Sequence, residues 1–306
     1  MSTIPAWLHR IVDDAAIFPP GNASLPEAVR GHAEHRDSGY ADLVGPFVVS
    51  DVKLPDLIQV LSGAKIATAD PLPVAVVVTG GAGAIEPAVR WASRSEVLDL
   101  RSVEVALRDE ADLPHNARRV VTMVDQLLSS GDLDEDVAVY VEPPRLRGAD
   151  PSHLWLGALD EVAAADYRLK FRTGGVDADS VPGAAELAAC IGATLDRELP
   201  FKCTAGLHHA LRHTEAESDQ HGFLNVLLAT RASLDGGGAG DVAAVLDEQD
   251  PTQVRHALDA LGPDTLGSTR RWFTGFGSCS VLEPLEDLVD LDLVSARTVG
   301  TPQRSR

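Results

Sequence analysis

The chain has 306 residues, 44% of them hydrophobic, and a formal net charge of −20. Its length suits either one large α/β barrel or two smaller domains. The acidic balance argues against a nucleic-acid or anionic-membrane surface, because those partners need clustered Lys and Arg, so any basic site has to be local.

The expected cellular setting is a reducing cytoplasm. Three scattered cysteines are too few for a disulfide framework or a four-cysteine zinc site. The opening residues, MSTIPAWLHRIVDD, lack the basic start and apolar run of a signal peptide. No segment reaches the ~18 apolar residues of a membrane span. We therefore expect a cytoplasmic protein with no membrane partner.

Short β-branched runs alternate with stretches of helical period along the chain. A first strand candidate, IVDDAAIF (11–18), precedes a helix whose start has Ser24 and, three residues later, Glu27, the pattern of a capping box. Seven further apolar runs are typical of strands buried on both faces. They are LVGPFVVS (43–50), PVAVVVTGG (73–81), SVEVAL (102–107), VAVYVEPP (137–144), YRLKFRTGG (167–175), PFKCTAG (200–206) and WFTGFGS (272–278).

Eight strands that alternate with helices predict an α/β fold, a (β/α)8 TIM barrel formed by residues 1–306 as a single domain. The doubly wound sheet is the alternative, but no G-x-G-x-x-G motif follows the first strand. About 65 residues separate the last two strands, more than one crossover helix needs. We expect a helical insertion over 207–270, which either caps the active-site mouth or forms an interface in a homo-oligomer.

Two of the chain's four lysines lie near matching strand ends, in LKFRTGG and PFKCTAG. Alternation along a strand places Lys170 with Arg172 on one face, and Lys202 with Thr204 on one face of the next strand. Two neighbouring ammonium groups in a dehydrated pocket lower each other's pKa, which frees a neutral amine to form a Schiff base with a carbonyl. Alternatively, both lysines are surface residues that neutralise nearby acids.

Glycines follow both lysines, at Gly174, Gly175 and Gly206, and the last strand ends in GFGSCS with Ser278 and Ser280. Backbone N–H groups exposed by such turns form a cradle for an anion such as phosphate. The alternative is that these glycines only make tight turns.

Glu104 and Glu142 lie within or at the end of apolar strands, where an unpaired charge is unfavourable and a lysine partner is expected. Each is either a proton carrier or a structural ion-pair partner. Proton transfer is favoured for Glu104, and both roles stay open for Glu142.

Histidines suggest a competing metal site, since His208 and His209 closely follow the second lysine and can bind a divalent metal with a carboxylate. No H-x-H or H-E-x-x-H pattern is present. We expect no metal, and a substrate contact or proton transfer for His208 or His209. His32 and His35 are expected on the exposed side of an early helix.

The order of these motifs resembles the deoxyribose-phosphate aldolase family, class I aldolases built on a (β/α)8 barrel. The family's Schiff-base strand, K-T-S-T-G, is similar to K-F-R-T-G at 170–174, and its next strand, K-A-S-G-G, to K-C-T-A-G at 202–206. Its phosphate turn, F-G-A-S-S, is similar to F-G-S-C-S at 276–280. The resemblance extends over most of the chain outside the late insertion and is carried by order and spacing.

This resemblance implies that Lys170 is the Schiff-base nucleophile, Lys202 the neighbour that lowers its pKa, and Glu104 the proton-relay acid in place of the family's aspartate. Arg172 stands where the family has a small serine, and its fixed charge suits a carboxylate. The expected substrate-binding residues are Arg172, Thr173, Gly174, Gly175, Thr204, Gly206, His208, Ser278 and Ser280.

The predicted activity is that of a cofactor-free class I aldolase or related lyase acting on a small phosphorylated or carboxylated carbonyl compound. Two alternatives remain. One is a metal-dependent lyase or hydrolase that uses His208 and His209. The other is a non-catalytic barrel that binds a ligand or partner through the 207–270 insertion.

Overall fold

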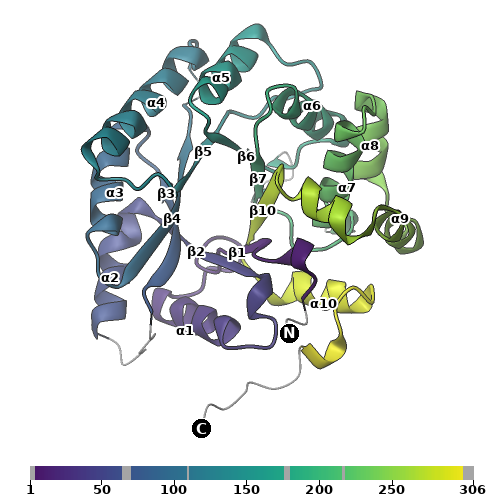
Figure 1. Cartoon of the computed structure of the whole chain (residues 1–306), viewed down its shortest axis with the longest axis horizontal. Helices are drawn as coiled ribbons and strands as arrows, with labels where there is room; N and C mark the ends of the chain where they lie inside the picture. Colours follow the sequence, from purple (N-terminus) through teal and green to yellow (C-terminus); the bar gives the residue numbers. More distant parts are fainter. Residues whose placement is uncertain (1–3, 64–69, 109, 176–179, 216–217, 299–306) are drawn as a thin grey trace.

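Eight parallel strands close into a barrel with helices outside it, as the sequence predicts (Figure 1). The computed structural model describes residues 4–63, 70–108, 110–175, 180–215 and 218–298. Around the barrel the strands follow the order β1, β10, β7, β6, β5, β4, β3, β2. Their bounds are β1 Val12–Asp14, β2 Val44–Ser50, β3 Leu72–Val78, β4 Leu98–Ala106, β5 Ala138–Glu142, β6 Arg168–Arg172, β7 Phe201–Thr204 and β10 Phe273–Ser278.

The α-helices cover the outside of the barrel, and their ends follow local sequence signals. The capping box of α1 is present, because the Ser24 N–H donates to Glu27 Oε2 over 3.3 Å. Within the described residues, no helix is both long and apolar enough to cross a bilayer. The helices are α1 Leu25–Arg36, α2 Leu54–Gly63, α3 Ile85–Ser93, α4 Leu113–Ser130, α5 His153–Ala164, α6 Ala184–Leu195, α7 Phe223–Leu234, α8 Ala239–Asp247, α9 Pro251–Thr269 and α10 Leu282–Asp290.

Alternation along β6 and β7 separates apolar side chains outside the barrel from polar ones inside it. Phe171 and Phe201 face the helices, with ring centroids 5.7 Å apart. Lys170 directly precedes Phe171 and Lys202 directly follows Phe201, so both lysines point the opposite way, and they are register partners across the two parallel strands. The strand pattern therefore directs both amines into the barrel, where TIM barrels usually pack branched apolar side chains.

The interior on the amino side of the lysines is also polar. The Tyr140 hydroxyl lies 2.9 Å from Thr274 Oγ1 and accepts a hydrogen bond from Arg168 over 3.3 Å. The Lys202 ammonium lies 5.2 Å from the centre of the Tyr140 ring, within range of a cation–π interaction. Hydrogen-bonded polar side chains therefore fill the barrel interior on the amino side of the lysines.

The segment between β7 and β10 contains helices, as expected, and also a hairpin that the sequence pattern does not predict. The hairpin strands are β8 His213–Glu215 and β9 Ser218–Gln220. Helix α7 covers the barrel itself, since Phe223 stacks on Phe276 of β10 with centroids 4.8 Å apart. Among the described helices of this segment, α8 and α9 are therefore the ones added to the helices that cover the barrel.

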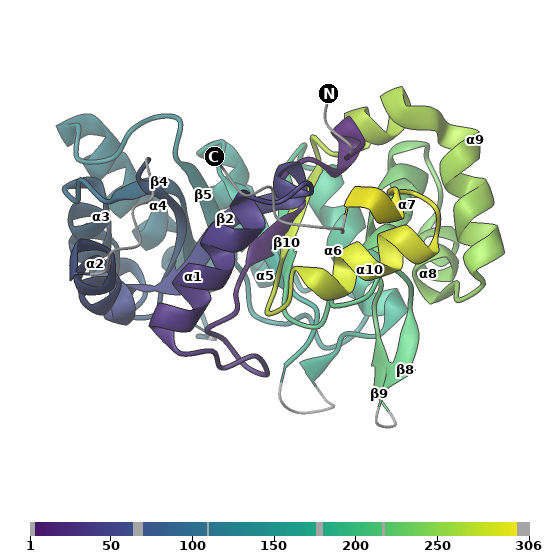
Figure 2. The same ribbon diagram turned by 90° about the horizontal axis from the view of Figure 1, so that it is seen from below.

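Helix α9 does not cap the active-site mouth, contrary to one of the two expectations for the insertion. It packs against the 3-10 helix η1 (Ala6–Leu8), which precedes β1 and therefore lies at the amino end of the barrel. Figure 2 shows the β8–β9 hairpin projecting from the opposite side of the molecule. The hairpin is thus the part of the insertion on the side of the strands' carboxyl ends.

Candidate active site

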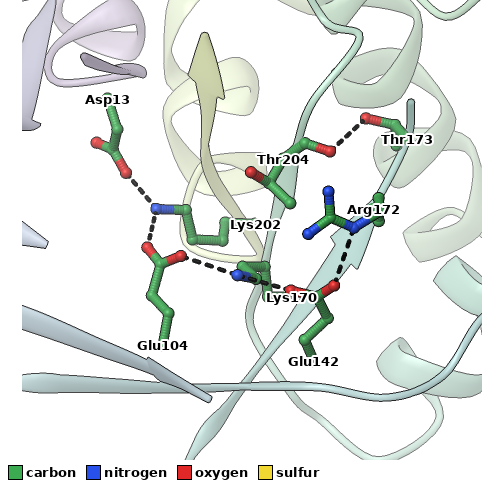
Figure 3. Close-up of polar contacts among 8 residues, drawn as sticks. All are labelled: Asp13, Glu104, Glu142, Lys170, Arg172, Thr173, Lys202 and Thr204. Atoms are coloured by element: carbon green, nitrogen blue, oxygen red, sulfur yellow. Dashed lines mark hydrogen bonds and ion pairs between the residues drawn. The ribbon is translucent and has the colours of Figure 1, made fainter. Parts of the chain in front are cut away.

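Lys170 and Lys202 lie side by side inside the barrel near the carboxyl ends of β6 and β7 (Figure 3). Only 2% of Lys170 and 3% of Lys202 is exposed to solvent. The alternative of two surface lysines is therefore wrong. Burying an ammonium group is unfavourable unless it is paired, so the acids around the two amines decide their chemistry.

Glu104 joins the two lysines. One of its carboxylate oxygens lies 3.1 Å from Lys170 Nζ and the other lies 2.7 Å from Lys202 Nζ. The side chain is 2% exposed and comes from the carboxyl-terminal part of β4, three strands away from β7 around the barrel. The expectation that a buried lysine would compensate the Glu104 charge is confirmed, and two lysines do so.

Each lysine has a second acid on its other side. Lys170 Nζ lies 2.7 Å from Glu142 Oε2, and Glu142 in turn accepts a hydrogen bond from Arg172 Nε over 3.2 Å. Lys202 donates to Asp13 of β1. Acids and bases thus alternate without a break in a group that we call the lysine network, composed of Asp13, Lys202, Glu104, Lys170, Glu142 and Arg172.

This alternation reverses the expected effect of Lys202 on Lys170. Burial by itself lowers the pKa of Lys170, but attraction to Glu142 and Glu104 outweighs it and the pKa is raised. Burial likewise lowers the pKa of Lys202, but attraction to Asp13 and Glu104 outweighs it and the pKa is raised. The pKa of Lys170 is thus raised and not lowered as the sequence suggests, because a carboxylate lies between the two amines and offsets their repulsion.

The carboxylates are held ionised by the same contacts. Burial raises the pKa of Glu104, but its two lysines outweigh it and lower the pKa to about 2. The pKa of Glu142 is also lowered, since Lys170 and Arg172 outweigh its burial. Glu104 and Glu142 are therefore the nearest acceptors for the proton that Lys170 must lose to become neutral.

Asp13 completes the network and was missed from the sequence. Burial raises its pKa despite the contact with Lys202. The available signal is the pair of adjacent acids in the otherwise apolar run IVDDAAIF, where one acid points into the barrel and the other out. The raised pKa makes Asp13 the acid of the network closest to accepting a proton.

The outward acid, Asp14, contacts α1. Its Oδ2 lies 2.9 Å from Nδ1 of His32, a residue with no exposed surface. The expectation that His32 lies on the exposed side of its helix is wrong, because the buried carboxylate of Asp14 attracts the imidazole into the helix–barrel interface. His35 is half-buried, and its Nδ1 lies 3.0 Å from the Tyr40 hydroxyl.

Gly45 on β2 leaves room for the Asp13 carboxylate. A Cβ atom at position 45 would lie 2.1 Å from Asp13 Oδ1. We expect Gly45→Ala to displace Asp13 from Lys202 and to lower the free energy of unfolding by about 1–3 kcal/mol. Gly31→Ala is the control, since no atom lies within 4 Å of its added Cβ and alanine favours a helix by ~0.5–1 kcal/mol. Equal stability of the two variants in urea denaturation would contradict this role for Gly45.

The glycine turns after β6 and β7 pack against each other. A Cβ on Gly174 would lie 2.7 Å from the Gly206 Cα, and Gly206 has a φ of 75°, which favours glycine. Thr173 is fully buried, and its hydroxyl donates to the Ala205 carbonyl over 2.6 Å. Gly174, Gly206 and Thr173 therefore hold the two turns together, whereas Gly175 is exposed.

Two backbone N–H groups at the turn after β10 are used internally. The Ser280 N–H donates to Ser278 Oγ over 3.3 Å, and the Glu283 N–H donates to Ser280 Oγ over 3.2 Å. The two serine hydroxyls therefore accept hydrogen bonds from N–H groups that, in an anion cradle, would donate to the ligand. Thr204, at the end of β7, is half-buried and its hydroxyl lies next to Gly277, toward the mouth.

The adjacent histidines bind two different acids of α10. His208 Nδ1 lies 2.9 Å from Glu283 Oε2, and His209 Nδ1 lies 3.1 Å from Asp287 Oδ2. In the part of the chain that the structure describes, no group of three His, Cys, Asp or Glu side chains is arranged to hold a metal ion. The two histidines thus tie the segment after β7 to α10.

A cleft of about 870 Å³ opens beside the carboxyl ends of β5 and β6. Glu142 and Arg172 line it, and Glu142 is the direct neighbour of Lys170. Its described lining also includes Arg145 and Arg147 from the segment after β5. Arg145 is bound through two nitrogens to Glu186, over 2.8 and 2.9 Å. The Glu142 carboxylate therefore lies between Lys170 and the solvent-filled cleft.

Comparison with known proteins assigns no family to the chain. No protein-family model matches it, and no curated protein matches it either. The resemblance to the deoxyribose-phosphate aldolases rests on the motifs at 170–174, 202–206 and 276–280.

Proposed function

We propose that the protein is an aldolase-type lyase that forms a Schiff base through Lys170. The observation that carries this proposal is a fully buried amine inside a TIM barrel, held between two carboxylates of which one, Glu142, lines an open cleft. TIM-barrel enzymes perform their chemistry at the carboxyl ends of the strands, where Lys170 and Lys202 lie.

Glu142 activates Lys170 by accepting its proton. The two groups are 2.7 Å apart, within hydrogen-bond reach for general acid–base catalysis. Transfer of the proton leaves a neutral amine next to a neutral acid, so the total charge of the lysine network does not change. This internal transfer replaces the pKa lowering by Lys202 that the sequence suggested.

The covalent steps then follow with all protons accounted for. The neutral Nζ adds to the substrate carbonyl, and a proton passes from nitrogen to oxygen to give a carbinolamine. Glu142 returns its proton to the hydroxyl, which leaves as water and forms the protonated imine. In the cleavage direction, a carboxylate takes the proton of the β-hydroxyl while the C–C bond electrons move to the imine nitrogen. The products are an aldehyde and an enamine, which is protonated on carbon and hydrolysed to release Lys170.

Glu104 and Lys202 assist the reaction because their charged groups lie next to the reacting nitrogen of Lys170. Glu104 stays ionised and stabilises the positive imine that forms on Lys170. Lys202 is paired with Asp13 and Glu104, neither of which lines the cleft, so it is the poorer nucleophile of the two lysines.

Borohydride inactivation tests the proposal. Incubation with a carbonyl substrate and borohydride is expected to inactivate the protein irreversibly, because the imine is reduced to a stable secondary amine. Borohydride alone is expected to leave it active. Turnover of a C–C bond substrate that continues undiminished under these conditions would favour the metal-dependent alternative. A carbonyl ligand that binds but gives neither turnover nor inactivation would favour the non-catalytic barrel.

A further inference from the structure

Arg172 offers free hydrogen-bond donors in the cleft. Its side chain is 54% exposed, and its Nε donates to Glu142. Among the residues that the structure describes, its two terminal nitrogens form no hydrogen bond or ion pair, and Figure 3 shows none from them to the other residues drawn. A guanidinium group with free terminal N–H groups binds a planar carboxylate through two parallel hydrogen bonds.

The alternative anion site, the turn after β10, is less suited to a ligand. The N–H groups of Ser280 and Glu283 already donate to serine hydroxyls, as described above. Glu283 also places a carboxylate in the first turn of α10, where it would repel a phosphate. The anion of the substrate is therefore better placed on the β6 side of the mouth.

Spacing along β6 limits the size of the ligand. Arg172 lies two residues beyond Lys170 on the same strand face, which corresponds to roughly 7 Å of strand. A ligand that contacts both side chains therefore carries its anionic group within a few bonds of its carbonyl carbon. This requirement fits a short oxo acid.

From these observations, and on the basis of the proposed function, we infer that Arg172 binds the carboxylate of a small oxo-acid substrate whose carbonyl reacts with Lys170. The carboxylate would then share Arg172 with Glu142. A weaker Arg172–Glu142 pair makes Glu142 a better proton acceptor for Lys170. Binding of the correct substrate would thereby promote formation of the neutral amine.

The test uses three probes, namely pyruvate, dihydroxyacetone phosphate and hydroxyacetone, with borohydride trapping measured by intact-protein mass. Pyruvate is expected to reach half-maximal trapping at a concentration at least about tenfold lower than hydroxyacetone. A factor of this size is expected from one hydrogen-bonded pair of opposite charges, here the pyruvate carboxylate and Arg172. Arg172→Gln is expected to remove this difference between pyruvate and hydroxyacetone, because only pyruvate has a carboxylate for Arg172 to bind. Arg147→Gln, a second exposed arginine of the same cleft, is expected to preserve it.

Each contrary outcome has a distinct meaning. Preferential trapping by dihydroxyacetone phosphate, or a larger effect of Arg147→Gln than of Arg172→Gln, would overturn the assignment of Arg172 while the Schiff-base function stands. Equal effects of Arg172→Gln on pyruvate and hydroxyacetone would also overturn it. No adduct with any of the three probes would count against the proposed function itself, and the inference would fall with it.

Discussion

Lys170→Met is expected to abolish Schiff-base formation and to lower turnover by at least about 10⁴-fold, because no other group in the network can replace the nucleophile. The substitution also leaves Glu104 and Glu142 with one buried cation fewer. We expect the free energy of unfolding to fall by about 3–5 kcal/mol, the usual effect of removing one partner of a buried ion pair. Turnover and urea denaturation measure the two effects.

Two controls separate loss of the nucleophile from loss of folding. The double variant Lys170→Met with Glu142→Gln restores the charge balance, so it should regain part of the stability without any activity. Lys202→Met removes the other buried lysine and should cause a similar stability loss, yet the protein should still form an adduct. An adduct on the Lys170→Met protein would exclude Lys170 as the nucleophile.

Glu104→Gln is expected to have the second largest effect, on stability and on pH dependence. The folded protein holds the pKa of Glu104 at about 2, below its ordinary value of 4.5. A lowered pKa stabilises the fold at pH values above the ordinary pKa, by about 3 kcal/mol here. We therefore expect Glu104→Gln to lose about this amount at pH 7, and the difference from the wild-type protein to shrink as pH falls from 4.5 toward 2.

The same substitution changes the reactivity of Lys170. Without the carboxylate between them, the two ammonium groups repel each other directly, and the pKa of Lys170 falls. The acid limb of the pH profile for adduct formation should move to lower pH in Glu104→Gln. A stability difference that grows on acidification, or an acid limb that moves to higher pH, would contradict the bridging role of Glu104.

Much of the fold follows from local sequence signals. The eight strands are predictable because each lies in a short run with apolar residues, and the apolar neighbours of Lys170 and Lys202 place both amines on the inner face of β6 and β7. The hairpin at 213–220 is not predictable in this way, because HTE and SDQ contain no apolar alternation.

The charge balance of the site could not be derived from the sequence. Asp13 and Lys202 are 189 positions apart and meet only because β1 and β7 both flank β10 in the closed barrel. The sequence indicated that Glu104 needs a lysine, but not that it would contact two and thereby cancel their repulsion. The direction of the Lys170 pKa shift depends on that bridge, which is why the sequence-based expectation was wrong.

The turns show a similar limit. Ser278 and Ser280 have the composition of an anion cradle, and composition alone cannot reveal that the N–H groups of Ser280 and Glu283 already donate to serine hydroxyls. In the structure the Ser280 N–H donates to Ser278 Oγ, and Thr173 fastens the β6 turn to the β7 turn. Arg172 keeps terminal N–H donors that form no hydrogen bond or ion pair with the described residues.

Mapping the reduced adduct tests the central claim most directly. The protein is incubated with pyruvate and borohydride, digested, and its lysine-containing peptides are identified by tandem mass spectrometry. We predict that the added mass lies on Lys170, in the peptide that contains LKFRTGG, and that Lys202 and the exposed Lys53 are unmodified. Modification of Lys202 in place of Lys170, or modification of Lys53 to the same extent, would contradict the assignment of Lys170 as the Schiff-base nucleophile.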